Sequence, residues 1–200
     1  LYICVRCVII YLIPIYPIRK GDLLLEFNQL IRERREITQY TNDAIPDHAL
    51  RNILDAALLA PSGNGLPSRE FIVVREKERL HHLEGTTPFM PWLKEAAAAI
   101  VVTGRPDVSK YWLQDASIAC SYIWLSAVDQ GLGAAFGAVY HAHDEKESKI
   151  REDFVRKALS IPYDTRILAI IGLGYPAAHP GSKEPPENSE LIYYESYQRK

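Results

Sequence analysis

The fold of this chain is decided by one stretch, Leu113-Gln-Asp-Ala-Ser-Ile-Ala-Cys-Ser-Tyr-Ile-Trp-Leu-Ser-Ala-Val-Asp-Gln130, with Gly131-Leu-Gly133 and Ala134-Ala-Phe-Gly-Ala-Val139 directly after it. The first part is apolar on nearly every side, which is typical of a central, buried helix. Its inward candidates are Ala119, Tyr122, Ile123, Ser126 and Ala127. The glycines predict a left-handed cap that ends the helix. The last part then predicts a strand that starts immediately after the turn.

Helices and strands are predicted on both sides of this stretch. Apolar residues at helical spacing predict a helix from Asp22 to about Arg35 and another that opens at Pro46 and stops at Pro61. A further amphipathic helix is expected at 145–159, and a short helix with a loop at 86–92 is expected between two strands. Short apolar runs predict strands at Phe71–Val74, Ala98–Thr103 and Ile167–Leu173.

This order of elements predicts an α+β fold. Two helices come first, and strands then alternate with helices, so we expect a three-layer sandwich in which a mixed sheet is flanked by helices. The sequence contains neither G-x-G-x-x-G after a strand nor G-x-x-x-x-G-K-[ST], which excludes the usual phosphate loops. Leu191-Ile-Tyr-Tyr194 resembles an edge strand with no local neighbour, and a partner subunit could supply the missing edge.

Composition limits the class of protein. A length of 200 residues suits one domain, and 48% hydrophobic with 24% charged residues is ordinary for a globular chain. The formal net charge of −2 argues against a nucleic-acid binder. The three cysteines do not form a disulfide framework, and Cys4-Val-Arg-Cys7 has no second metal pair. We therefore expect a cytoplasmic protein without a metal site.

The N-terminal residues 1–21 are expected to be an apolar extension or arm. Pro14 and Pro17 would break a membrane-spanning helix, and no small-residue cleavage site of a signal peptide precedes Arg19. An extended arm that covers the domain or a neighbour is one reading, and an extension left by a misplaced translation start is the other. We expect no membrane partner.

Two polar segments point to a ligand site. Arg34 and Arg35 close the first helix, and the glycine-rich turn Ala60-Pro-Ser-Gly-Asn-Gly-Leu-Pro67 follows the second. Arginine forks bind phosphate with charge-assisted hydrogen bonds, and glycines allow close approach to a ring. A solvated helix end and a simple cap with a turn would also account for these residues.

Five motifs, taken in order, resemble the nitroreductase family of FMN-dependent oxidoreductases. They are Arg34-Arg35-Glu-Ile-Thr-Gln-Tyr40, Ala60-Pro-Ser-Gly-Asn-Gly-Leu66, Gln114-Asp115-Ala116, Gly131-Leu-Gly133 and Gly172-Leu-Gly-Tyr-Pro176. The resemblance implies a nitroreductase-like domain over 22–176 and a C-terminal arm over 177–200 that packs on a partner. It further implies an intertwined homodimer with FMN at the interface. The implied reaction carries hydride from NADH or NADPH to a small-molecule electron acceptor, such as a nitroaromatic or a quinone, by alternating half-reactions.

The resemblance also assigns cofactor-binding residues. Phosphate ligands are expected at the first motif, loop residues at the ring, and the backbone of 136–139 beside the flavin N5. The full set is Arg34, Arg35, Glu36, Thr38, Ser62, Gly63, Asn64, Gly65, Leu66, Gly137, Ala138, Val139 and Lys183. Glu36 and Thr38 stand where the family usually has serine and a basic residue, and a carboxylate there would repel phosphate. No catalytic side chain is expected, because the flavin carries the chemistry.

Other residue groups have less specific readings. His141-Ala-His143-Asp144 offers metal ligands on paper, but a surface loop explains it as well. The aromatic residues Phe89, Trp92, Tyr111 and Trp112 could gate a flavin or belong to the core. Asp115 is read as a first-turn acid. The altered motifs leave two alternatives to an enzyme: a flavin-binding scaffold with little turnover, and a structural dimer without ligand.

Overall fold

The computed structural model describes residues 27–185 and 191–197. The α-helices are α1 (Phe27–Glu33), α2 (Asp47–Leu59), α3 (Lys77–Leu83), α4 (Trp112–Asp129) and α5 (Glu145–Leu159). The strands are β1 (Arg69–Val74), β2 (Ala98–Gly104), β3 (Gly133–Ala138) and β4 (Arg166–Gly174), and short 3-10 turns occupy Gly63–Gly65, Glu84–Thr86 and Pro91–Glu95. The predicted N-terminal extension and the start of the helix predicted from Asp22 lie outside the described residues.

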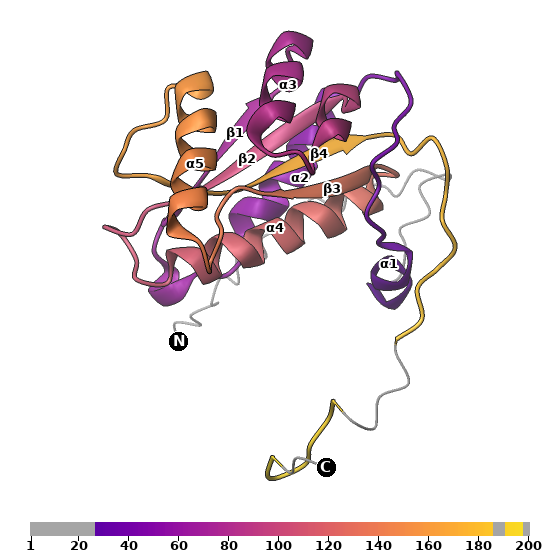
Figure 1. Ribbon diagram of the computed structural model, residues 1–200. Coiled ribbons are helices and arrows are strands. Elements are labelled where there is room, and N and C mark those ends of the chain that lie inside the picture. The colour runs from indigo at the N-terminus through magenta and orange to yellow at the C-terminus, as the bar shows by residue number, and fades with distance from the viewer. Residues whose placement is uncertain (1–26, 186–190, 198–200) are drawn as a thin grey trace, which may run out of the picture.

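The described residues form the three layers that the sequence predicted. Figure 1 shows α4 and α2 on one face of the sheet and α3 and α5 on the other. Alternate residues of β2 divide between two cores, with Ile100 packing toward α2 and α4 and Val101 toward the opposite helices. All residues of β2 are buried, because helices cover both faces of the strand.

The four strands pair antiparallel in the order β1-β2-β4-β3. We expected a mixed sheet, but these four strands are all antiparallel. Among the described residues, parallel pairing occurs only in the isolated bridge between Glu36 and Ala134, at the outer edge of β3. Ile37 N–H donates to the Ala134 carbonyl at 3.0 Å. A side chain at Gly133 would meet Ile37 at 2.6 Å, so glycine is needed for this close approach. The segment after α1 thus runs along the outer edge of β3.

The central helix α4 packs as expected on its inner face and differs on its outer face. Ala119, Ile123 and Ala127 are fully buried, and Ile123 and Ala127 belong to the core between the sheet and α2. Tyr122 is 40% exposed, so its prediction as an inward residue is wrong. Ile118 is 38% exposed on the same outer face. Because α4 is apolar on nearly every side, the described part of the chain leaves some of the hydrophobic surface of this helix exposed.

The turn after α4 has the predicted geometry. Gly131 has φ +72°, the left-handed conformation that favours glycine at a helix end. Leu132 N–H donates to the Ala127 carbonyl at 2.8 Å and closes the last turn of the helix. The chain then enters β3 directly.

A buried carboxylate ties α5 to β4. Glu152 is 3% exposed and receives two hydrogen bonds from Arg166, from Nη2 at 2.7 Å and from Nε at 2.9 Å. It also accepts from Ser148 Oγ at 3.0 Å and from Ile167 N–H at 3.1 Å. The charge is therefore paired and hydrogen-bonded, as a buried charge requires. This network fixes the angle at which α5 lies on the sheet.

The C-terminal segment does not form the expected edge strand within this chain. Residues 191–197 contain bends, and Leu191, Ile192, Tyr194 and Tyr197 are exposed. A strand would need a partner edge, and no strand of the described part of the chain lies beside these residues. The packing of residues 177–200 on a second copy stays a prediction.

Candidate functional site

Arg34 and Arg35 lie where α1 ends and the chain turns along the edge of β3. Arg34 N–H donates to the Leu30 carbonyl at 3.0 Å, which completes the last turn. The helix therefore presents its carbonyl end here, and basic side chains complement that end of the dipole. The two guanidinium groups are carried next to α4 and β3.

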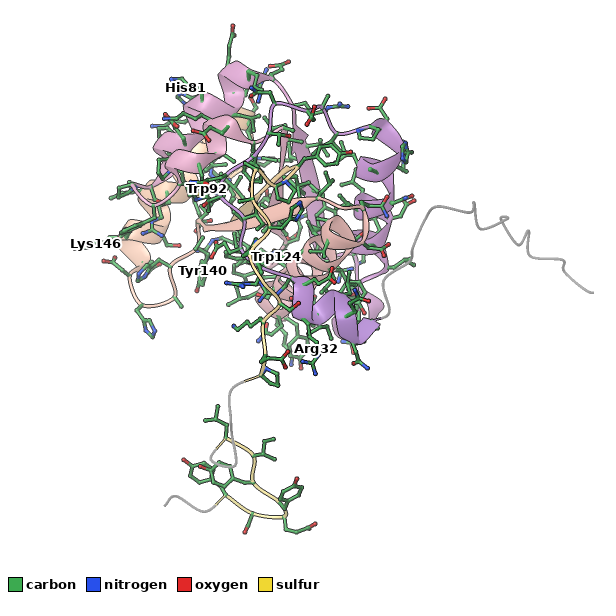
Figure 2. The ribbon with its side chains drawn as sticks, turned by 90° about the vertical axis from the view of Figure 1, so that its right-hand side faces the viewer. Arg32, His81, Trp92, Trp124, Tyr140 and Lys146 are labelled. Atoms are coloured by element: carbon green, nitrogen blue, oxygen red, sulfur yellow. The ribbon has the colours of Figure 1, made fainter. Side chains whose placement is uncertain are left out.

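The indole ring of Trp124, on α4, contacts both arginines. The guanidinium carbon of Arg34 lies 4.8 Å from the centroid of the Trp124 ring. Trp124 Nε1 donates to the Arg35 carbonyl at 3.2 Å, so the indole holds the backbone as well as the side chain. The ring also stacks on Phe136 of β3, with centroids 6.4 Å apart. Figure 2 shows Trp124 beside the C-terminal segment, with Arg32 below it.

The C-terminal segment closes the other side. Arg35 Nη1 donates to the Gly181 carbonyl at 2.5 Å, and Lys183 N–H donates to the Arg32 carbonyl at 2.8 Å. Arg32 also pairs with Glu184. These contacts border an open pocket of about 500 Å³, which we call the cation cradle. It is lined by Arg34, Arg35, Glu36, Trp124, Ser182, Lys183 and Glu184.

The charges of the cradle suit an anion. Within the described residues, Arg34, Arg35 and Lys183 form no salt bridge within 4.0 Å, whereas Arg32 is neutralised by Glu184. Guanidinium forks and an ammonium group are the usual ligands of a phosphate dianion. The donor set therefore fits a phosphate. Two carboxylates also line the cradle: Glu184 is paired with Arg32, and Glu36 is the one that would repel the phosphate.

The edge of β3 next to the cradle has backbone groups that point away from the sheet. The Ala134 carbonyl accepts from the Ile37 N–H on the side away from β4. In an antiparallel strand the N–H and C=O groups of every second residue face the same side, so those of Phe136 and Ala138 also point outward. Phe136 N–H donates to Glu36 Oε1 at 3.3 Å, and the Ala138 carbonyl accepts from Arg151 Nη1 at 3.2 Å.

This alternation separates the three predicted backbone contacts. The Val139 N–H donates to the Leu168 carbonyl at 3.0 Å, and the backbone groups of Gly137 face β4. A side chain at Gly137 would collide with Met90 Sδ at 1.8 Å, so its glycine serves packing. Ala138 is exposed and directs its N–H outward. Of the three, only Ala138 has the position to donate to a ring.

The loop Ser62–Leu66 is held by a buried aspartate. Asp115 is 2% exposed and accepts from Gly63 N–H at 2.8 Å and from Ser68 Oγ at 2.6 Å. Asn64 and Gly65 adopt φ +56° and +67°, so the loop turns through two left-handed residues. The sequence reading of Asp115 as a simple first-turn acid missed this role. The available signal was a carboxylate within an otherwise apolar helix.

Asp115→Ala is expected to loosen this loop. It would leave the Gly63 N–H and the Ser68 hydroxyl without their acceptor, at a cost of about 1–3 kcal/mol for each buried group. Hydrogen exchange of residues 61–68 should accelerate, and the free energy of unfolding should fall by about 2–4 kcal/mol. Ser117→Ala, an exposed change on the same helix, is the control. Unchanged exchange in the loop would contradict the assignment.

The structure does not gather all predicted site residues in one place. The loop Ser62–Leu66 does not line the cradle, and Thr38 is exposed outside it. Asp115 and Trp124 are nine positions apart on α4, about 13 Å at roughly 1.5 Å per residue, so the loop and the cradle lie near opposite ends of that helix.

The aromatic gate is also not formed as one cluster. Trp92 Nε1 donates to the Phe89 carbonyl at 3.1 Å on the face of α3 and α5. Tyr111 instead packs on Gly63, and Trp112 meets Tyr140 edge to face at 5.5 Å. These residues therefore belong to separate parts of the domain.

Two further observations concern chemistry within the described residues. Burial raises the pKa of the Cys120 thiol to about 12, so the thiol stays protonated near neutral pH and is a poor nucleophile. No helix in the described ranges combines the length and apolar character needed to cross a bilayer.

Comparison with known proteins identifies the family and agrees with the fold. The sequence profile described as the nitroreductase family matches residues 31–101 and 81–175. A protein of Methanothermobacter thermautotrophicus, provisionally named NADH dehydrogenase/NAD(P)H nitroreductase, is 35% identical over 170 residues, which are 84% of each chain.

Solved structures share both the fold and part of the sequence. A crystal structure of a provisionally named NADH dehydrogenase/NAD(P)H nitroreductase from Bacteroides thetaiotaomicron matches with a TM-score of 0.79 and 31% identity, over 85% of this chain and 97% of that one. An FMN-dependent nitroreductase from Clostridium difficile matches with a TM-score of 0.76 and 31% identity, over 84% and 98%.

Proposed function

Because this chain belongs to the nitroreductase family, we propose that it is an FMN-dependent oxidoreductase that uses NADH or NADPH to reduce nitroaromatic, quinone or similar electron-poor acceptors. The observation that carries the proposal is the cation cradle, where Arg34, Arg35 and Lys183 surround about 500 Å³ without a salt-bridge partner among the described residues. An anionic cofactor tail supplies the charge that these groups lack.

Each part of the site has a role in this proposal. FMN, when bound, accepts hydride from the nicotinamide and passes electrons on to the acceptor. Arg34 and Lys183 would hold the phosphate, and the Trp124 ring would support the Arg34 guanidinium, which lies 4.8 Å from its centroid. The outward Ala138 N–H would donate a hydrogen bond to the ring edge. Such a preoriented donor favours added electron density on the ring without an acidic side chain.

We propose further that the protein is a homodimer built on the outer face of α4. Ile118 and Tyr122 are exposed there, and the neighbouring Phe27 is 67% exposed. Two copies related by a two-fold axis would cross their α4 helices antiparallel. The loop at the start of one helix would then lie near the cradle at the end of the other. A dimer thus brings together the two parts that a single chain keeps apart.

Ile118→Glu is expected to convert this dimer to a monomer, because it places two carboxylates near the symmetry axis of an apolar interface. Analytical ultracentrifugation measures the outcome, and FMN affinity should fall with dimerisation. Ile150→Glu, at a 71% exposed position of α5 in the opposite layer, is the matched control and should stay dimeric. A wild-type monomer at micromolar concentration would refute the interface.

The enzyme proposal is tested by spectroscopy of the purified chain. A yellow chromophore, or quenching of added FMN fluorescence, is expected, followed by bleaching under anaerobic NADH or NADPH. Absence of any flavin binding would overturn the proposal. Binding without bleaching would favour the second candidate, a flavin-binding protein with little turnover. That alternative rests on Glu36, a carboxylate in the cradle.

A further inference from the structure

Glu36 is the one residue of the cradle whose chemistry opposes the proposed ligand. Its carboxylate lines the same cavity as Arg34, Arg35 and Lys183. The other acid of the cavity, Glu184, is already paired with Arg32. Within the described residues Glu36 makes no salt bridge within 4.0 Å, so its negative charge is balanced only by the cavity as a whole.

The carboxylate also occupies a backbone donor that an anion would use. Phe136 N–H points outward from β3 and donates to Glu36 Oε1. Two neighbouring N–H groups are committed elsewhere, since Ile37 donates to Ala134 and Lys183 donates to Arg32. The end of α1 contributes carbonyls and no N–H groups to this region. Glu36 therefore stands where a phosphate oxygen would find its backbone partner.

The contact is weak enough to be exchanged. Its length is 3.3 Å, whereas charge-assisted N–H···O hydrogen bonds are typically about 2.7–2.9 Å. The side chain is exposed, so it can turn into solvent without leaving a buried charge. Among the described residues, the Phe136 N–H is the one hydrogen-bond partner of the Glu36 carboxylate, so the side chain can leave it without breaking another contact.

We propose that Glu36 is a built-in competitor of the flavin phosphate. In the ligand-free protein it caps the Phe136 N–H and offsets part of the positive charge of the cradle, and FMN must displace it to bind. The proposal rests on the proposed FMN function and adds a regulatory consequence: the cofactor exchanges readily instead of staying permanently bound. Riboflavin, which lacks the phosphate, does not compete with Glu36.

The test compares FMN with riboflavin on the full chain after removal of any copurified flavin. Glu36→Gln removes the charge and keeps the size of the side chain, and it should lower the Kd for FMN about tenfold at low salt. The dissociation rate of FMN should fall with it. The Kd for riboflavin should not change. High salt should shrink the difference, because the Debye length falls to about 3 Å at 1 M.

Glu33→Gln is the matched control, with the same change of net charge three positions away and outside the cradle lining. It should leave both affinities unchanged, and Glu36→Ser should repeat the tightening seen with glutamine. FMN binding that is unaltered or weaker in Glu36→Gln would overturn the proposal, as would equal tightening of riboflavin. If neither the wild type nor Glu36→Gln binds either flavin, the proposed function fails together with this inference. If the wild type binds FMN and Glu36→Gln binds it no more tightly, only the competitor role fails.

Discussion

Arg34→Ala is expected to weaken FMN binding by about 10- to 100-fold while leaving riboflavin binding nearly unchanged. A hydrogen bond to a charged group contributes roughly 1.5–3 kcal/mol, and Arg34 has no competing salt bridge among the described residues. Its guanidinium is already oriented by Trp124 at 4.8 Å, so little side-chain entropy is lost on binding. Fluorescence titration with the two flavins measures the difference directly.

Arg35→Lys provides the comparison for this prediction. One N–H of the Arg35 guanidinium already donates to the Gly181 carbonyl, and a lysine at this position keeps the positive charge in the cradle. Its effect on FMN affinity should therefore be much smaller than that of Arg34→Ala, above all at low salt. Equal losses in the two variants would mean that the phosphate ligands are misassigned.

Glu152→Ala is expected to cost about 3–5 kcal/mol of the free energy of unfolding, because breaking a buried ion pair leaves its partners unsatisfied. The partners are Arg166, Ser148, the Ile167 N–H and, in a longer ion pair at 3.9 Å, Arg156. Chemical denaturation monitored by far-ultraviolet circular dichroism gives the value. FMN affinity at temperatures where the variant is folded should change little, since this network lies outside the cradle lining.

Two variants calibrate that measurement. Glu152→Gln keeps the volume and part of the hydrogen bonding, so its loss should lie between the wild type and alanine. Lys149→Ala, at an exposed position of the same helix, should change stability by less than about 0.5 kcal/mol. A loss in Glu152→Ala no larger than in Lys149→Ala would show that the ion pair contributes nothing net.

Much of the fold followed from local patterns in the sequence. The apolar stretch ending at Gly131 predicted α4, its left-handed cap and the entry into β3, and the structure confirms all three. Periodicity also placed α2 and α5 within a few residues of their ends. Periodicity did not predict which face of α4 is buried, since Tyr122, expected to point inward, is exposed. A helix that is apolar all round has no pattern that distinguishes its two sides.

Only part of the candidate site could be predicted from the sequence. Side-chain chemistry pointed to Arg34 and Arg35 as candidate phosphate ligands, and the resemblance to the family added Lys183. The structure places these three around one cavity. The role of Asp115 under the loop was not predictable, because Gly63 and Ser68 are its partners across about fifty positions of sequence. Likewise, the choice of Ala138 over Gly137 and Val139 depends on the pairing of β3 with β4.

By itself the sequence determined the helices and strands and their order, because these depend on local periodicity and capping. The nitroreductase family was indicated by the resemblance of five motifs, and the sequence profile then showed it. Only the tertiary structure decided which backbone donors face outward, which cations stay without a carboxylate, and that Glu36 sits among them. Strand register and the docking of distant segments fix those features. They arise from long-range contacts, which no local pattern along the chain encodes.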